Sequence, residues 1–285
     1  MEEEGSQVPD RAPLPADPSL CPELPDDARA ALAAGVSQRL PNGLPAAALI
    51  ALEDHLRLLL AWTAAINLTA VREPVAAVTA HVLDSLAAVP LLRAAGVDVV
   101  LDLGSGGGYP GLPLAIALPA RHALLVDSTA KKVRFLETAI TALGLGGSVG
   151  AAAVRAEELA ADPRHREAWQ AVTARAVASL AELVELSFPL LGVGGMLVAW
   201  KRSDLADERV AALPAIAALG GGRLEVHATG PGDHVIVTVT KTGATRASWP
   251  RTPTERRRQP WRRSGQGNAS ARHLIARTGS TPGGV

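Results

Sequence analysis

The stretch that decides the fold is residues 99–119, which reads V-V-L-D-L-G-S-G-G-G-Y-P-G-L-P-L-A-I-A-L-P. It opens with a short apolar, β-branched run, which is typical of a buried strand. Asp102 breaks that run, and four glycines follow within five residues, at positions 104, 106, 107 and 108. Pro110 and Pro113 stand near the start of the next apolar segment, where the first turn of a helix tolerates proline. Strand, glycine loop and helix, in this order, form the first unit of a nucleotide-binding α/β fold.

The acid before the glycines indicates which ligand this loop holds. Gly106, Gly108 and Gly111 match a dinucleotide fingerprint, but that motif would begin three residues after the strand and place Asp102 beside a pyrophosphate. A carboxylate there suits a cationic or neutral cofactor better. S-adenosylmethionine (SAM) carries a sulfonium and an ammonium group and no phosphate. The run D-L-G-S-G-G-G therefore predicts a SAM site, with an NAD-dependent dehydrogenase as the alternative.

Composition and charge limit the remaining possibilities. The single cysteine, Cys21, argues against disulfides and cysteine metal sites and fits a reducing compartment. The acidic N-terminus lacks the apolar core of a secretory signal, and no uncharged apolar run reaches transmembrane length. We therefore expect a cytoplasmic protein without a metal site or a membrane contact.

The formal net charge of zero hides two oppositely charged ends. Residues 1–27 hold eight acids and one base, a net charge of −7, and residues 244–285 hold nine arginines and one acid, a net charge of +8. A basic end of this kind is either a solvated extension or a contact to nucleic acid. The acidic end could shield the basic one within the same chain.

Four segments differ in composition. Residues 1–43 are acidic and proline-rich, so we expect them to be mostly disordered, with a short helix around residues 27–40. Residues 44–96 read as an N-terminal helical segment, residues 97–243 as a SAM-binding methyltransferase domain, and residues 244–285 as a mostly disordered basic tail.

Strands and helices alternate through the main segment, which predicts a doubly wound, Rossmann-like parallel sheet. The expected strands are 99–103, 122–126, 149–154, 171–174 and 196–200, followed by an antiparallel hairpin of 223–229 and 234–241. The expected helices are 45–66, 75–92, one beginning near 112, 129–143, 179–191 and 204–219, with a glycine turn at 192–195. Seven strands that end in a hairpin favour a class I methyltransferase over a dehydrogenase.

Two charged residues are placed in the crevice by this topology. Asp127 ends the second strand, where one carboxylate can accept hydrogen bonds from both ribose hydroxyls; its alternative role is to cap the next helix. Arg175 ends the fourth strand, beside the Gly104 loop, where its planar fork could hold an anion.

Several stretches together resemble one family. They are N-L-T-A-V-R-E-P at 67–74, H-V-L-D-S-L at 81–86, D-L-G-S-G-G-G-Y-P-G-L-P-L at 102–114, D-S with K-K-V-R-F-L at 127–136, and R-A at 175–176. They look like RsmG, also called GidB, a family of bacterial methyltransferases that modify guanine N7 in 16S ribosomal RNA. The resemblance covers about residues 45–243, and Trp249-Pro250-Arg251 resembles a Tyr-Pro-Arg motif near the family's C-terminus. His81 and Asp84 either serve this site or brace the N-terminal helices against the main segment.

The resemblance implies SAM contacts at Gly104, Tyr109, Ala156, Glu157 and Arg175. RNA would be bound by Arg72, Lys131, Lys132, Lys201, Arg251 and the basic tail, and the substrate would be 16S rRNA or the small ribosomal subunit. Guanine N7 carries a lone pair and no proton, so we expect catalysis by positioning and name no acid–base residue. We expect a monomer. The alternatives are a methyltransferase for another acceptor and a non-catalytic SAM- and RNA-binding assembly factor.

Overall fold

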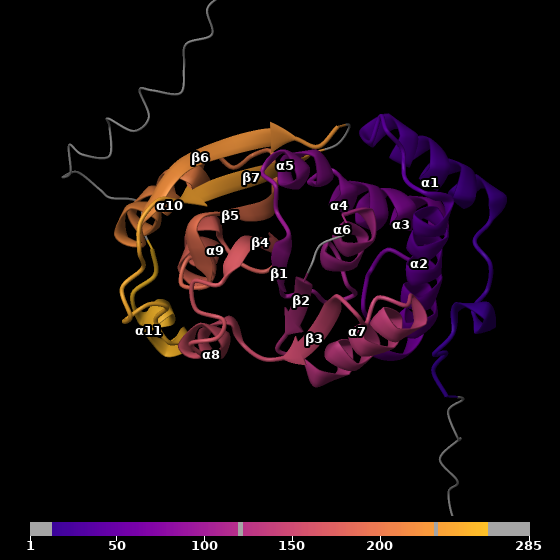
Figure 1. The fold of residues 1–285 in the computed structure, drawn as a ribbon, viewed down its shortest axis with the longest axis horizontal. Helices are drawn as coiled ribbons and strands as arrows, with labels where there is room; N and C mark the ends of the chain where they lie inside the picture. Colours follow the sequence, from indigo (N-terminus) through magenta and orange to yellow (C-terminus); the bar gives the residue numbers. More distant parts are fainter. Residues whose placement is uncertain (1–12, 119–121, 231–232, 262–285) are drawn as a thin grey trace, which may run out of the picture.

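A computed structural model describes residues 13–118, 122–230 and 233–261, and its centre is a seven-stranded sheet (Figure 1). The strand order is β3-β2-β1-β4-β5-β7-β6. Strands β1 to β5 pair in parallel, while β7 runs antiparallel to both β5 and β6. The strands are β1 (Val99–Leu103), β2 (His122–Asp127), β3 (Val149–Ala153), β4 (Trp169–Arg175), β5 (Leu191–Arg202), β6 (Gly221–Ala228) and β7 (His234–Lys241). The doubly wound sheet and its terminal hairpin are thereby confirmed.

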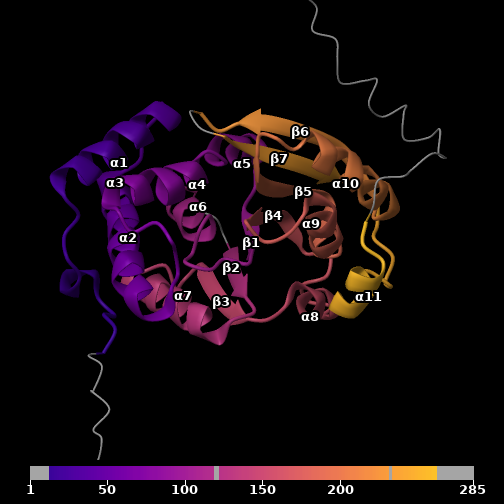
Figure 2. The ribbon, with the colours of Figure 1, turned by 180° about the vertical axis from the view of Figure 1, so that it is seen from behind.

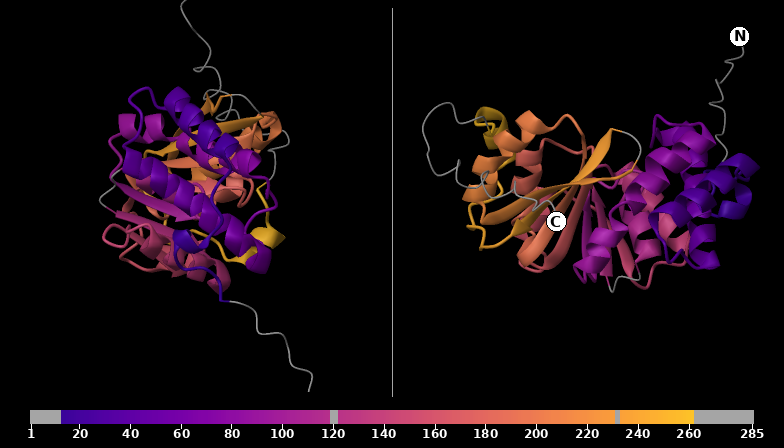
Figure 3. Two further views of the ribbon diagram at one scale, coloured as in Figure 1. Left: turned by 90° about the vertical axis from the view of Figure 1, so that its right-hand side faces the viewer. Right: turned by 90° about the horizontal axis from the view of Figure 1, so that it is seen from above.

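Helices cover both faces of the sheet and enclose two apolar cores (Figures 1 and 3). The core that contains Val198 and Trp200 packs against the N-terminal helices, α6 and α7. The core that contains Leu197 and Ala199 packs against α8, α9 and α10. These four residues alternate between the faces because successive side chains of a strand point to opposite sides. The helices here are α6 (Gly111–Ala117), α7 (Ala130–Ala142), α8 (Ala156–Ala161), α9 (Leu180–Ser187) and α10 (Ala206–Ala218).

Residues 13–43 pack against the fold, which corrects the disorder expected for them. Helix α1 (Asp26–Arg39) confirms the short helix, and Cys21, Leu24 and Leu32 are buried beside α2 (Ala46–Ile66). Backbone carbonyls of the proline-rich lead are held by side chains of α2: Trp62 Nε1 donates to Pro15 O at 2.7 Å. The lead is therefore anchored by the neighbouring helix, a long-range contact that its own composition does not reveal.

Residues 74–94 form a broken helical segment rather than one regular helix. It comprises α3 (Pro74–Ala77), a π-helical turn (Val78–Leu83), α4 (Asp84–Leu86) and α5 (Val89–Ala94). By length and apolar composition the segment could cross a membrane, but 56% of its most apolar window is buried inside the protein. Packing against α1, α2 and α6 accounts for that composition (Figure 2).

Two expectations near the end of the chain are also corrected. The glycines at 192–195 lie within β5, next to a register shift opposite β4, instead of forming a turn. A Cβ on Gly195 would lie 2.8 Å from Gln170 O, so the strands approach too closely there for a side chain. Residues 244–261, here called the C-terminal strap, fold back along α8 and α9 and contain α11 (Pro253–Arg258) (Figure 1). The expected disorder of the tail is wrong for the strap, and residues 262–285 lie outside the described residues.

Candidate functional site

The glycine loop after β1 adopts a backbone that side chains disfavour. Gly104, Gly106 and Gly108 have φ angles of +71°, +56° and +85°, in the left-handed region. The backbone N–H of Gly104 donates to Val126 O at 2.8 Å and thereby joins the loop to the end of β2. A Cβ on Gly104 would lie 2.6 Å from Val177 Cγ2. The loop therefore brings bare backbone to the carboxyl ends of β1 and β4.

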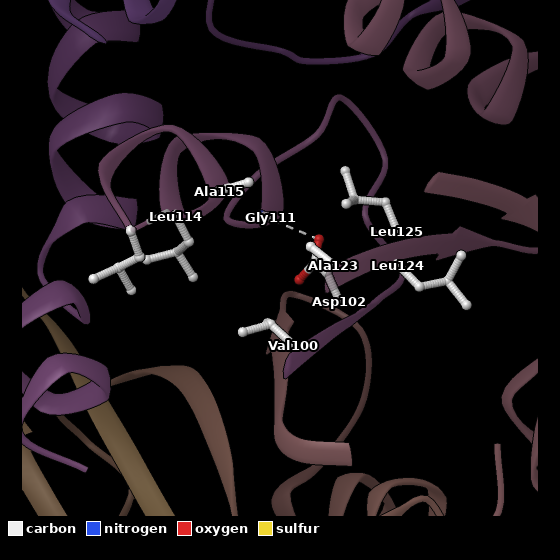
Figure 4. A pocket seen from close by; sticks show the side chains of 9 residues that line it. Val100, Asp102, Gly111, Leu114, Ala115, Ala123, Leu124 and Leu125 are labelled. Carbon is white, nitrogen blue, oxygen red and sulfur yellow. Dashed lines mark hydrogen bonds between the residues drawn. The ribbon is translucent and has the colours of Figure 1, made fainter. Parts of the chain in front are cut away.

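Asp102 is buried and contacts Gly111 at the start of α6 (Figure 4), whereas the sequence predicted a carboxylate that faces the cofactor. It is 1% exposed; Thr173 Oγ1 donates to its Oδ1 at 2.6 Å, and Gly111 N donates to its Oδ2 at 3.3 Å. Apolar side chains such as Leu114 and Leu125 surround it, and this burial raises its pKa to about 6. Asp102 thus joins β1, β4 and the start of α6, and its charge does not select the cofactor by direct contact.

Tyr109 is the centre of a buried ring stack at the end of the loop. Its ring centroid lies 4.4 Å from that of His55 and 5.1 Å from that of His81, and the Arg175 guanidinium carbon lies 5.5 Å from it. The Tyr109 side chain is buried, and its hydroxyl has no hydrogen-bond partner among the described residues. A buried hydroxyl without a partner is costly, so this atom fits a site that a polar ligand completes.

His55 reaches the loop from helix α2, and the sequence had not singled it out. Its Nε2 lies 2.8 Å from Gly107 O, so Nε2 carries the proton and donates to that carbonyl. The side chain is fully buried, and burial lowers its pKa to about 4. The sequence did contain a signal for its burial, because position 55 lies on the same apolar helix face as Leu52 and Leu59.

Arg175 is where the family-like motifs meet. One of its terminal nitrogens donates to Ala80 O at 2.7 Å and to Asp84 Oδ2 at 3.2 Å, and the other lies 3.4 Å from His81 Nδ1. His81 therefore accepts through Nδ1 and donates through Nε2 to Thr69 Oγ1, at 2.7 Å. Burial and Arg175 together lower the pKa of His81 to about 4. His81 and Asp84 thus brace the N-terminal helices against the end of β4 and orient Arg175.

Asp127 ends β2, as predicted, and holds both neighbouring turns. Gly106 N donates to its Oδ2 at 3.1 Å, and Thr129 N donates to its Oδ1 at 2.9 Å. Lys132 Nζ lies 3.6 Å from Oδ2. The carboxylate therefore stabilises the start of α7 and the glycine loop together, and Lys132 belongs to this site as well as to α7.

Ala156 and Glu157 begin α8, directly after β3. The Glu157 carboxylate pairs with Arg256 of the C-terminal strap, and Arg256 also donates to Glu182 at 3.1 Å. In Figure 1, α8 and α11 lie side by side, on the part of the sheet remote from α2. Glu157 is therefore reached by the strap and not by the Tyr109 stack.

Besides Lys132, two further residues expected to bind RNA have partners within the protein. Lys201 Nζ donates to Ala178 O and to Glu208 Oε1, both at 2.6 Å, and its side chain is 11% exposed. Arg251 forms a fork with the buried Glu185. Both residues therefore have structural roles, whereas Arg72 and Lys131 are exposed on the surface.

This sheet order, with a glycine loop after β1, defines the class I SAM-dependent methyltransferase fold. A solved O-methyltransferase from Bacillus cereus in complex with SAH aligns with a TM-score of 0.50 at 17% identity, covering 74% of this chain and 97% of that one. At that identity the likeness shows the fold alone.

Residues 49–237 match the family described as rRNA small subunit methyltransferase G, or GidB, and the chain belongs to this family. A relative of that name from Roseiflexus sp. (strain RS-1) is 43% identical over 194 residues, which are 67% of this chain and 82% of the relative. Another, from Geobacillus kaustophilus (strain HTA426), is 36% identical over 224 residues, 76% of this chain and 92% of the relative. The resemblance to RsmG is confirmed.

Proposed function

We propose that this protein transfers the methyl group of SAM to N7 of one guanine in 16S rRNA, either free or within the small ribosomal subunit. The observation that carries the proposal is the meeting of the N-L-T and H-V-L-D-S motifs at Arg175, beside Tyr109 and the glycine loop. The name shared by the relatives, rRNA small subunit methyltransferase G, supports rRNA as the acceptor. N7 and 16S rRNA are what the RsmG resemblance implies.

SAM supplies an electrophilic methyl group when bound, and the residues at the glycine loop fit it. Gly104 and its neighbours offer close backbone approach, and Tyr109 has a buried hydroxyl that lacks a partner among the described residues. We assign cofactor contacts to these two residues and to Asp127 and Arg175. Ala156 and Glu157 are retained from the resemblance as contacts at the end of β3. Residues 97–243 would form the SAM-binding unit, with 44–96 shaping it.

The protein's own contribution to the reaction is positioning. Guanine N7 offers a lone pair and carries no proton, so no side chain needs to act as a base before transfer. Arg175, held by Asp84 and His81, keeps the wall of the site fixed, which matters because small displacements of reacting groups cost large factors in rate. The N-terminal helical segment therefore contributes to the reaction by holding Arg175 in a fixed orientation through Asp84 and His81.

The RNA is reached through exposed cations outside this cleft. Arg72 follows the N-L-T motif and Lys131 begins α7, and both are exposed. Residues 262–285 carry four more arginines. Phosphate contacts of this kind position RNA without reading its sequence. We propose a cytoplasmic monomer with no membrane contact.

The test is methyl transfer from labelled SAM to free rRNA and to small subunits from a strain that lacks this gene, with the product identified by mass spectrometry. We expect 7-methylguanine at one position. Arg175→Ala should lower the rate about 100-fold, because its bracing network is lost. Arg223→Ala, an exposed change on β6, is the matched control and should leave the rate unchanged.

Other outcomes identify the alternatives. SAM binding without transfer to any form of rRNA would indicate a non-catalytic assembly factor or another acceptor. Thermal stabilisation by NAD and not by SAM would refute the assignment of the glycine loop.

A further inference from the structure

An open groove of about 620 Å³ lies at the carboxyl ends of β4 and β5. Two sequence motifs supply His81, Arg175 and Ala176 to its lining. The residues that matter for its chemistry are His81, Arg175, Trp200, Arg202, Glu208 and His234. They come from the N-terminal helical segment, β4, β5, α10 and β7, so the groove exists only in the assembled fold.

The groove adjoins the glycine loop. Arg175 belongs to both, since it lines the groove and lies over Tyr109. The next residue, Ala176, has a φ of +56°, which is uncommon for a residue with a Cβ. Val177, one residue further, packs against Gly104. A ligand in the groove would therefore lie within a few residues of the proposed cofactor loop.

The charges in the groove are paired, which limits the kind of ligand it takes. Arg175 pairs with Asp84, Lys201 with Glu208, and Arg202 with Asp233. His81 stays neutral at physiological pH because burial lowers its pKa to about 4. A phosphate needs an excess of positive charge, and among the described residues of the groove these pairs leave none. The groove suits an uncharged, planar, polar ligand instead.

Its lining matches a nucleobase. His81, Trp200 and His234 line the groove, and the His234 side chain is 45% exposed, so its ring can stack on a base that leaves a helix. Two carboxylates, Asp204 and Glu208, border it too. Guanine presents N1–H and an N2 amino group as donors on one edge, which a carboxylate accepts, whereas adenine presents a bare N1 acceptor there.

We propose that this groove receives the acceptor guanine itself, turned out of the RNA, with the carboxylate of Glu208 or Asp204 on its N1–H and N2 edge. The proposal rests on the proposed function, because it names the place of the acceptor base. The RNA backbone stays outside the groove, because the groove's paired charges do not favour a phosphate. The opposite edge of guanine, which carries N7, then faces the glycine loop where the cofactor is proposed to bind.

The first test of the groove is a substitution that fills it with a side chain. Ala80 borders the groove, and Ala80→Phe places a ring in it; Ala76→Phe puts the same ring on the exposed side of α3 as a control. We expect Ala80→Phe to bind SAM like the wild type, by calorimetry, and to lose methyl transfer about 100-fold. Transfer at the wild-type rate by a folded Ala80→Phe variant would overturn the proposal.

A second pair of variants does not depend on filling the groove. Glu208→Gln keeps an oxygen for Lys201 and for Leu180 N but loses the charge. We expect its kcat/KM for RNA to fall about 10-fold with the KM for SAM unchanged, since one carboxylate pairing with a base edge is lost. Asp204→Asn tests the other carboxylate, and Glu137→Gln on the exposed face of α7 is the control. Wild-type values for both groove variants would contradict the assignment of the base edge.

Equilibrium dialysis separates the groove from the proposed reaction. Labelled guanosine should bind the wild-type protein in the presence of S-adenosylhomocysteine, and adenosine about 10-fold more weakly. Ala80→Phe should abolish guanosine binding. If the wild-type protein binds guanosine this way but methylates no rRNA, the proposed function fails and the groove assignment stands. Equal binding of guanosine and adenosine would refute the groove as a guanine site.

Discussion

Three ionisable residues, the buried His55 and Asp102 and the half-buried His81, give the site a dependence on pH. The pKa values of both histidines are lowered to about 4, so between pH 6.5 and 4 the unfolded chain takes up protons that the folded protein refuses. The folded protein therefore loses stability as the pH falls through this range. The pKa of Asp102 is raised to about 6, so on acidification the folded protein takes up that proton first, which partly offsets the loss.

Single substitutions should separate these contributions. In His55→Gln, the free energy of unfolding should fall less steeply between pH 6.5 and 4, by about 1 kcal/mol per pH unit. In Asp102→Asn it should fall more steeply than in the wild type. Urea unfolding at a series of pH values measures both slopes. Identical slopes for the wild type and both variants would show that these groups titrate normally in the folded protein.

Among the elements, the C-terminal strap depends on one buried carboxylate. Glu185 is fully buried on α9 and accepts from Arg251 Nε at 2.9 Å and from Trp261 Nε1 at 2.6 Å. The Arg251 guanidinium carbon lies 5.0 Å and 4.8 Å from the ring centroids of Trp249 and Trp261. Charge pairing and stacking together hold the strap.

Arg251→Ala should therefore destabilise the protein by about 3 kcal/mol, because it leaves the Glu185 carboxylate buried and without its cation. Thermal and urea unfolding measure the loss. Arg258→Ala, an exposed change at the end of α11, should cost less than about 0.5 kcal/mol. If Arg251→Ala kept full stability but weakened RNA binding, Arg251 would be the RNA contact that its sequence context suggested.

The same element shows where sequence reasoning ends. The strand, glycine loop and helix at 99–119 could be predicted because short-range periodicity and glycine content determine them. The fold of the strap could not be predicted, because its arginines resemble those of a solvated tail. The partner of Arg251, Glu185, lies 66 residues away in the chain. Arg175 was placed in the cleft by topology, but its partners Ala80, His81 and Asp84 meet it only across the fold. The place of His55 on the apolar face of α2 could be read from the sequence, but its contact with Gly107 could not, because the two residues meet only across the fold.

At the scale of the whole molecule, the first part of the basic end belongs to the described fold. The strap, residues 244–261, packs on α8 and α9, where Arg166 donates to the carbonyls of Thr245, Arg246 and Trp249. Residues 262–285, beyond it, hold four arginines and no acid. A deletion that begins at 244 therefore removes part of the fold, and one that begins at 262 leaves the described residues of the strap in place.

Deletion of 262–285 should leave the melting temperature unchanged and make RNA binding less dependent on salt. Four lost cations reduce the slope of log Kd against log salt concentration by at most about 3, since each phosphate contact on single-stranded RNA contributes about 0.7. Binding titrations of 16S rRNA fragments from 50 to 300 mM salt measure this slope. Deletion of 244–285 should also lower the melting temperature, because Glu185 then loses Arg251. An unchanged slope after deletion of 262–285 would mean that the tail does not contact RNA, and that the exposed cations of the folded part, such as Arg72 and Lys131, carry the electrostatic attraction.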